Sequence, residues 1–216
     1  MSKAFFIVAF LFFTSSYSQK NIKIVFEEHM LIKGKSLKGV PEHLRDKFVK
    51  QLQGMKRESY MSIQNNKVYF ESKHSDKEVI DKGVVDTKGA KEGVLFTKDM
   101  STSVSFSEVR MVKDSKTNTY VTQVKKELLS KKLPVAQWKI TNKQKKILGY
   151  TCHEAVTTYK NQILTVYFTK ELKVIASPTT LPFINGVVLE YNCGPTFAKA
   201  VKVEMNQPVI ANFFKI

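Results

Sequence analysis

The sequence has 216 residues, with 35 lysines and arginines against 19 acidic residues, so its formal net charge is +16. A hydrophobic content of 43% excludes a largely disordered chain, and the length suffices for one sizeable core. Arginine, whose planar fork suits phosphates and base edges, occurs only at Arg45, Arg57 and Arg110. We therefore predict no nucleic-acid partner. The scattered lysines indicate a soluble surface, with attraction to an anionic partner as the alternative.

The first residues have the features of an export signal. Lys3 precedes an unbroken apolar run over 4–13, and Ser16 and Ser18 stand before a cut at Gln19. The run is shorter than the ~20 residues of a membrane span, so cleavage is favoured over a signal anchor. No cysteine lies near the cut for lipid attachment. We predict a signal peptide over 1–18 and a periplasmic or secreted β-rich domain over 19–216, without a membrane span.

The mature chain begins with a strand at 20–32, where β-branched residues partly alternate. Residues 41–55 are the one clear helix, because Leu44, Phe48, Leu52 and Met55 recur at helical spacing. Such an amphipathic helix packs on a sheet or lies on a membrane surface. We predict packing on a sheet, with Phe48 as a core anchor.

The middle of the chain is less regular. Residues 58–72 predict a hairpin around Asn65 and Asn66, which tolerate turn dihedrals. A polar, glycine-containing loop is predicted over 74–93, followed by one or two strands in 94–112 and a turn over 113–119. Residues 120–129 fit a strand better than a helix, because a short connector follows them.

From Val135 onward, short runs with strand-forming residues alternate with tight polar turns. The predicted strands are 135–141, 146–159, 163–172, 186–193 and 196–205, with a longer loop over 173–185. The expected fold is mainly β: a curved antiparallel up-and-down sheet or half-open barrel with one short amphipathic helix. Trp138 and Tyr150 are its candidate core anchors, with a binding platform as the alternative for Trp138.

Cys152 and His153 are adjacent in one predicted strand, so their side chains point to opposite faces. They cannot then share a metal ion or form a thiolate–imidazole pair. Cys152 and Cys193 both lie on apolar strand faces, and the predicted export places them in an oxidising compartment. We predict a disulfide between them, with two free buried thiols as the alternative.

The sequence lacks the short motifs of hydrolases, nucleotide-binding proteins and zinc proteases. Its four histidines, His29, His43, His74 and His153, are isolated from one another. We therefore predict no catalytic residue, no metal site and no cofactor, and expect that the chain is not an enzyme. A metal or catalytic site around His153 on a sheet face is the alternative.

Three segments, QWKITNKQKKILGYTCHEA from Gln137, VYFTKEL from Val166 and GVVLEY from Gly186, resemble the GLPGLI family of exported bacterial proteins. The hexapeptide that names the family is replaced by FINGVV at 183–188. The resemblance implies an exported protein with no catalytic residues. By analogy it also implies the half-open barrel of periplasmic lipoprotein carriers, in which the helix could plug a cavity.

The predicted function is therefore non-enzymatic binding of a hydrophobic ligand or lipidated partner in the concavity of a curved sheet. The alternative is an interaction protein that docks on an outer-membrane complex through sheet edges or its basic surface. The expected partners are a lipid or an envelope protein, and the oligomeric state is left open.

Overall fold

The computed structural model describes residues 21–31, 41–86, 96–124, 127–210 and 212–214. The predicted signal peptide, residues 1–18, lies outside this part of the chain. Among the described residues, no helix combines the length and the apolar character needed to cross a membrane.

Eleven antiparallel strands form one large sheet in the order β8-β7-β6-β3-β2-β1-β13-β12-β11-β10-β9. Their bounds are β1 (Ile22–Met30), β2 (Lys56–Gln64), β3 (Lys67–Ser72), β6 (Val109–Asp114), β7 (Thr119–Val124), β8 (Glu127–Lys132), β9 (Lys139–Ile147), β10 (Tyr150–Tyr159), β11 (Gln162–Thr169), β12 (Val187–Cys193) and β13 (Thr196–Met205). Most neighbours in the sheet are neighbours in sequence, which is up-and-down topology.

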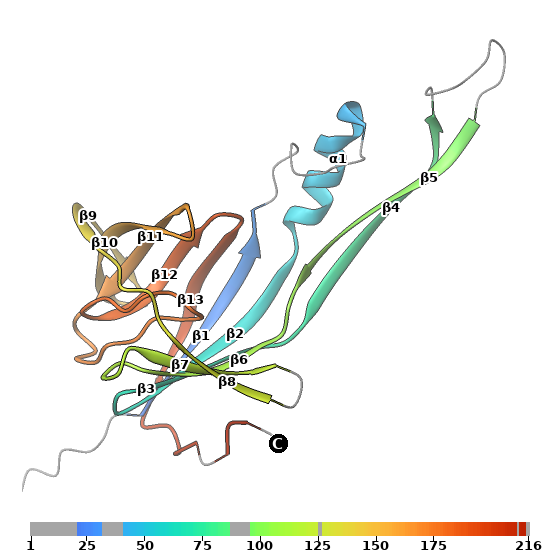
Figure 1. Ribbon diagram of the computed structural model, residues 1–216. Helices are drawn as coiled ribbons and strands as arrows, with labels where there is room; N and C mark the ends of the chain where they lie inside the picture. Colours follow the sequence, from blue (N-terminus) through green and yellow to red (C-terminus); the bar gives the residue numbers. More distant parts are fainter. Residues whose placement is uncertain (1–20, 32–40, 87–95, 125–126, 211, 215–216) are drawn as a thin grey trace, which may run out of the picture.

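The sheet is strongly curved, and its edge strands β8 and β9 do not pair, so it stays open (Figure 1). Strands β1 and β13 pair at its centre, where Ile22 lies opposite Met205. The prediction of a mainly β fold with a curved antiparallel sheet and one short helix is confirmed.

The prediction of a loop over 74–93 is wrong, because a long strand begins there. β4 (Ser75–Asp86) and β5 (Phe96–Phe106) form a two-stranded hairpin that projects from the sheet beside α1 (Glu42–Gln53) (Figure 1). β4 is polar, so its sequence does not indicate a strand. Pairing with β5 along the whole hairpin outweighs this low local strand propensity. A lone hairpin is marginally stable, and α1 supports this one by packing against both strands.

The core lies on the concave face of the sheet. Alternate side chains of neighbouring strands meet there in rows; in one row Ile24 lies opposite Met61, which lies opposite Phe70. The segment 170–186, between β11 and β12, contributes Leu172 and Leu181 to the same cluster. The concavity is thus filled by the chain itself, and α1 packs on the hairpin instead of plugging it.

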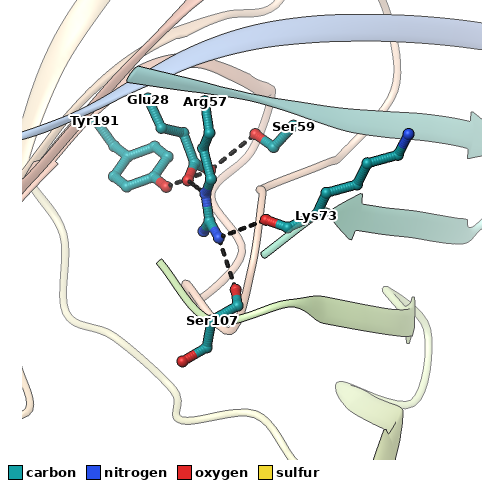
Figure 2. Close-up of polar contacts among 6 residues, drawn as sticks. All are labelled: Glu28, Arg57, Ser59, Lys73, Ser107 and Tyr191. Carbon is teal, nitrogen blue, oxygen red and sulfur yellow. Dashed lines mark hydrogen bonds and ion pairs between the residues drawn. The ribbon is translucent and has the colours of Figure 1, made fainter. Parts of the chain in front are cut away.

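The apolar face ends at a buried ion pair between β1 and β2 (Figure 2). Arg57 Nε donates to Glu28 Oε2 at 2.6 Å, and Ser59 Oγ donates to Glu28 Oε1 at 2.8 Å. Tyr191 on β12 donates its hydroxyl to the same oxygen at 3.3 Å, across β13. Burial, together with the charge of Glu28, raises the pKa of Tyr191 well above its usual value, so this hydroxyl keeps its proton.

The same guanidinium holds the base of the β4–β5 hairpin. Arg57 Nη1 donates to the carbonyl oxygen of Lys73, just before β4, at 3.3 Å, and to that of Ser107, just after β5, at 2.6 Å (Figure 2). The guanidinium carbon also lies 4.4 Å from the centre of the Phe106 ring. One side chain therefore fixes where both strands of the hairpin leave the sheet.

We predict that Arg57→Leu destabilises the protein by about 3–5 kcal/mol, because it leaves the Glu28 carboxylate buried without its partner. Chemical denaturation should show a lower transition midpoint. The control is Lys56→Met, which removes an ion pair to Glu27 with a half-exposed lysine and should cost less than ~1 kcal/mol. Equal losses in the two variants would contradict the role given to the buried pair.

The predicted disulfide between Cys152 and Cys193 is wrong, because both thiols are free. Cys193 on β12 lies opposite Leu164 on β11, which lies opposite Thr157 on β10. Cys152 is two strands away and five residues further along β10. With ~4.8 Å between strands and ~3.3 Å per residue, the Cα atoms are roughly 19 Å apart. A disulfide needs less than ~7 Å.

We expect thiol titration of the unreduced protein in denaturant to count two free thiols. In the native protein Cys193, which is partly exposed, should react before Cys152, which is buried. Burial, with a smaller effect from the charge of Glu171, raises the pKa of Cys152 to about 11, so little thiolate is present at neutral pH. Detection of no thiol before reduction would contradict the geometry.

Candidate functional site: a groove beside the only tryptophan

A pocket with a volume of about 440 Å³ lies between the segment leading into β9 and the loop that covers the core. We call it the tryptophan groove. Its lining consists of Ser115, Asn118, Pro134, Val135, Ala136, Trp138, Ile175, Phe183, Ile184 and Asn185. None of these side chains is charged. This volume is typical of small-molecule sites.

Two aromatic side chains form one wall of the tryptophan groove, and the loop beneath them is held from several sides. The Trp138 indole N–H donates to the carbonyl oxygen of Phe183 at 2.9 Å. On β10, the Tyr159 hydroxyl pairs with Thr180 Oγ1 at 2.7 Å. A parallel bridge between Ala176 and β12 fixes the loop where it returns to the sheet. The wall is therefore set before any ligand arrives.

Gly186 closes the loop at a place that admits only glycine. Its φ is +150°, and a Cβ built there would lie 2.5 Å from the carbonyl oxygen of Thr169 and 2.8 Å from the Phe168 ring. A side chain would push the end of the loop off the sheet. The close approach keeps Asn185 at the rim of the tryptophan groove.

A buried lysine supports the loop from the opposite side of the core. Lys113 on β6 is fully buried, and its ammonium nitrogen donates to Ser177 O and Ser177 Oγ at 2.7 Å each and to Leu181 O at 2.8 Å. The same nitrogen lies 4.5 Å from the centre of the Phe183 ring. Lys113 therefore joins the β6 side of the sheet to the loop that carries one wall of the tryptophan groove.

The sequence reading missed Lys113 by placing it in a turn over 113–119. Strand β6 runs to Asp114, and Lys113 occupies the buried position that follows Met111 in the alternation. It lies opposite Val68, whose other neighbour is Ile63, so the pattern calls for an apolar residue here. A lysine at an apolar position of an alternating strand is the signal that could have identified it.

Burial lowers the pKa of Lys113 well below the ordinary 10.5. Between the folded and the unfolded pKa the unfolded chain binds more protons, so this residue adds stability as the pH rises towards ~10.5. We predict that the stability of the wild type relative to Lys113→Met increases between about pH 7 and about pH 10. Urea denaturation at both pH values measures it. Lys131→Met, at an exposed lysine, is the control, and a pH-independent difference for Lys113→Met would contradict the assignment.

A second depression of about 300 Å³ adjoins the tryptophan groove and shares Ile175 and Asn185 with it. Lys170 and Lys173 line this part. The two depressions form one continuous surface along the loop, with an uncharged aromatic end and a basic end.

The predicted anchors occupy different places. Phe48 is fully buried beneath the hairpin, whereas Trp138 and Tyr150 are partly exposed and pack against the rim of the core. Trp138 also precedes β9, since the strand predicted at 135–141 begins only at Lys139. Cys152 and His153 lie in a strand as predicted. The Cys152 thiol donates to the Tyr150 carbonyl oxygen at 3.6 Å, while the His153 ring lies against Phe168.

Two buried glutamates, Glu154 on β10 and Glu190 on β12, lie in one row of the sheet on either side of Tyr167. Glu154 accepts hydrogen bonds from Tyr167 at 2.8 Å and from Thr141 at 3.0 Å, and Glu190 accepts one from Lys145 at 2.5 Å. The Tyr167 hydrogen bond, with help from Thr141, lowers the pKa of Glu154. A general acid needs a raised pKa to hold its proton near neutral pH. Glu154 lacks this property, and both carboxylates accept hydrogen bonds within the sheet.

Comparison with known proteins gives one family match. The model described as "N-glycanase peptide, N-terminal domain" matches residues 59–213, more than half of the chain. No curated protein matches the sequence. The match replaces the resemblance to the GLPGLI family, which rested on strand and turn motifs such as those around Trp138 and Gly149; other antiparallel sheets share such patterns.

Two crystal structures of PNGF-II, in space groups C2 and P21, have a similar fold, with TM-scores of 0.54 and 0.55. Each is 16% identical in sequence. The alignments cover 88% and 89% of this chain but 28% and 29% of the PNGF-II chains, so this chain spans less than a third of their length. At this identity the likeness shows the fold alone.

These findings overturn the two functions predicted from the sequence: a carrier of a hydrophobic ligand or lipidated partner, and a docking protein of an outer-membrane complex. The structure gives the physical reason for the first correction. The concavity that would hold a lipid is filled by the core cluster and by the loop over it.

Proposed function

The chain belongs to the family of N-glycanase N-terminal domains, and on this premise we propose that it is a non-catalytic module that holds glycoprotein substrate for an N-glycanase. The family match is the observation that carries the proposal. What is matched is an N-terminal domain, and the aligned part is less than a third of the PNGF-II chains. The chemistry of the whole N-glycanase is therefore assigned to the remainder of such a protein.

The carboxylates of the described residues support a role without catalysis. A carboxyl group that acts as a general acid must keep its proton near neutral pH. The glutamates and aspartates with a shifted pKa all have it lowered: Glu27, Asp114, Glu154 and Glu204. The most buried carboxylate, Glu28, is occupied by Arg57 and by two hydroxyl groups.

The tryptophan groove supports a role in holding substrate. It is preformed, lies at the surface and carries an aromatic wall, which are properties of ligand-binding sites. The signal peptide predicted over 1–18 remains a prediction and agrees with a module that meets glycoproteins outside the cytoplasm.

We predict that the purified protein binds a glycoprotein more tightly than the same polypeptide prepared without its N-glycan. It should release no glycan during prolonged incubation. Biolayer interferometry with the two immobilised forms measures binding, and mass spectrometry of the glycoprotein detects release.

Two results would overturn this function. Release of free glycan by the protein alone would make it an enzyme, and equal binding of the two forms would remove the glycan from recognition. A variant with Gly186→Ala tests the site, because a displaced loop should weaken glycan-dependent binding while thermal unfolding reports whether the sheet still folds.

A further inference from the structure

The tryptophan groove is uncharged although the chain is strongly basic. Lysine and arginine make up 35 of the 216 residues, yet none lines this pocket. Lys113, the nearest buried cation, lies behind Phe183 and uses its hydrogen bonds on the loop. Lys170 and Lys173 line the adjoining depression and not the groove itself, so a group inside the groove finds no counter-charge, and the site selects a neutral one there.

The aromatic wall is fixed and has no spare donor. The only N–H of the Trp138 side chain is used by the carbonyl oxygen of Phe183, so the indole offers a ligand its apolar surface alone. The ring of Phe183 is held from behind by the Lys113 ammonium. The apolar face of an indole held in this way fits the C–H face of a sugar ring, which stacks without hydrogen bonds.

Polar recognition is left to the rim of the groove beside Gly186. Asn185 is exposed there, and among the described residues its carboxamide has no hydrogen-bond partner. A carboxamide offers two donors and one acceptor oxygen. Ile175, 41% exposed, stands at the same rim and supplies an apolar contact. An acetamido group matches this pair, since it has an N–H, a carbonyl oxygen and a methyl group.

We propose that the tryptophan groove is a subsite for a neutral N-acetylhexosamine residue, stacked on Trp138 with its acetamido group at Asn185 and Ile175. This inference rests on the proposed function, because such a sugar joins an N-linked glycan to its asparagine. A purely apolar ligand fits less well, since the groove stays open at Val135, which is 89% exposed, and carries a free amide at its rim.

The fluorescence of Trp138 reports on this site alone, because the chain has no other tryptophan. Titration of the full protein with N,N′-diacetylchitobiose should give a saturable change in intensity or emission wavelength. Cellobiose, which has the same ring linkage without acetamido groups, should bind at least about 10-fold more weakly, the loss expected for one unmade pair of polar contacts.

Two variants, measured by calorimetry, separate the wall from the rim. Trp138→Ala should weaken chitobiose binding by about 10-fold or more through loss of stacking, and Asn185→Ala by about 10-fold. Asn185 holds no structural hydrogen bond in the described part of the chain, so its variant should fold even if Trp138→Ala loosens the loop. The controls are Lys131→Ala, at an exposed lysine of β8, and Ile163→Ala, an apolar side chain 72% exposed on β11.

Saturable chitobiose binding that is lost in Asn185→Ala and kept in both controls supports the assignment. No fluorescence response at any concentration, equal binding of cellobiose, or an unchanged affinity in Asn185→Ala overturns it. Glycan-dependent glycoprotein binding that survives Asn185→Ala defeats this subsite and leaves the module function standing. Loss of all glycan dependence in the wild type defeats the function itself.

Discussion

The arrangement of the candidate site depends on one amine. Lys113 extends from an otherwise apolar row of the sheet and binds three oxygen atoms of the loop that covers the core. Without it the buried carbonyl oxygen of Ser177 would lose this donor and that of Leu181 would keep only the Ser177 hydroxyl, and leaving a buried carbonyl unpaired is costly. The loop in turn positions Phe183 and Asn185, so Lys113 connects the buried face of β6 to the tryptophan groove at the surface.

Arg57, at the opposite end of the strands from Lys113, is also a cation that holds segments of the backbone. Both cations bind backbone carbonyls of segments that leave regular pairing: Lys113 binds the loop before β12, and Arg57 binds the two ends of the β4–β5 hairpin. They differ in how their positive charge is compensated, because Arg57 faces the carboxylate of Glu28 whereas Lys113 has only neutral oxygens around it. That difference explains why burial shifts the pKa of Lys113 so far.

Alternation of side chains made most strands predictable, and helical spacing made α1 predictable, because both signals are local. β4 was missed because its polar sequence pairs only with β5. The predicted strands 135–141 and 146–159 left the turn between them to the lysine-rich stretch that separates them. In the structure this turn is at Leu148 and Gly149, which both have positive φ. The tryptophan groove was out of reach, because its wall joins Trp138 to a loop some 45 residues later. The prediction of the disulfide was wrong for the same reason. The sequence indicates which face of its strand each cysteine occupies, but not the distance between Cys152 and Cys193 across two strands.

The pairing of β1 with β13 has a consequence for how the protein forms. Ile22 lies opposite Met205 at the middle of the sheet, so this central pairing joins the two described strands that are most distant in sequence. The other strands of the sheet pair mostly with their neighbours in sequence. The two halves of the sheet, one ending at β1 and the other at β13, are each a meander that can assemble early. The apolar face of each meander stays exposed to water until the two pair. Closure over so many residues is slow, because loop entropy must be overcome before the central pairing yields any contact. During that delay two unpaired strand edges face solvent, and a chaperone or rapid docking of the two meanders would shield them from aggregation.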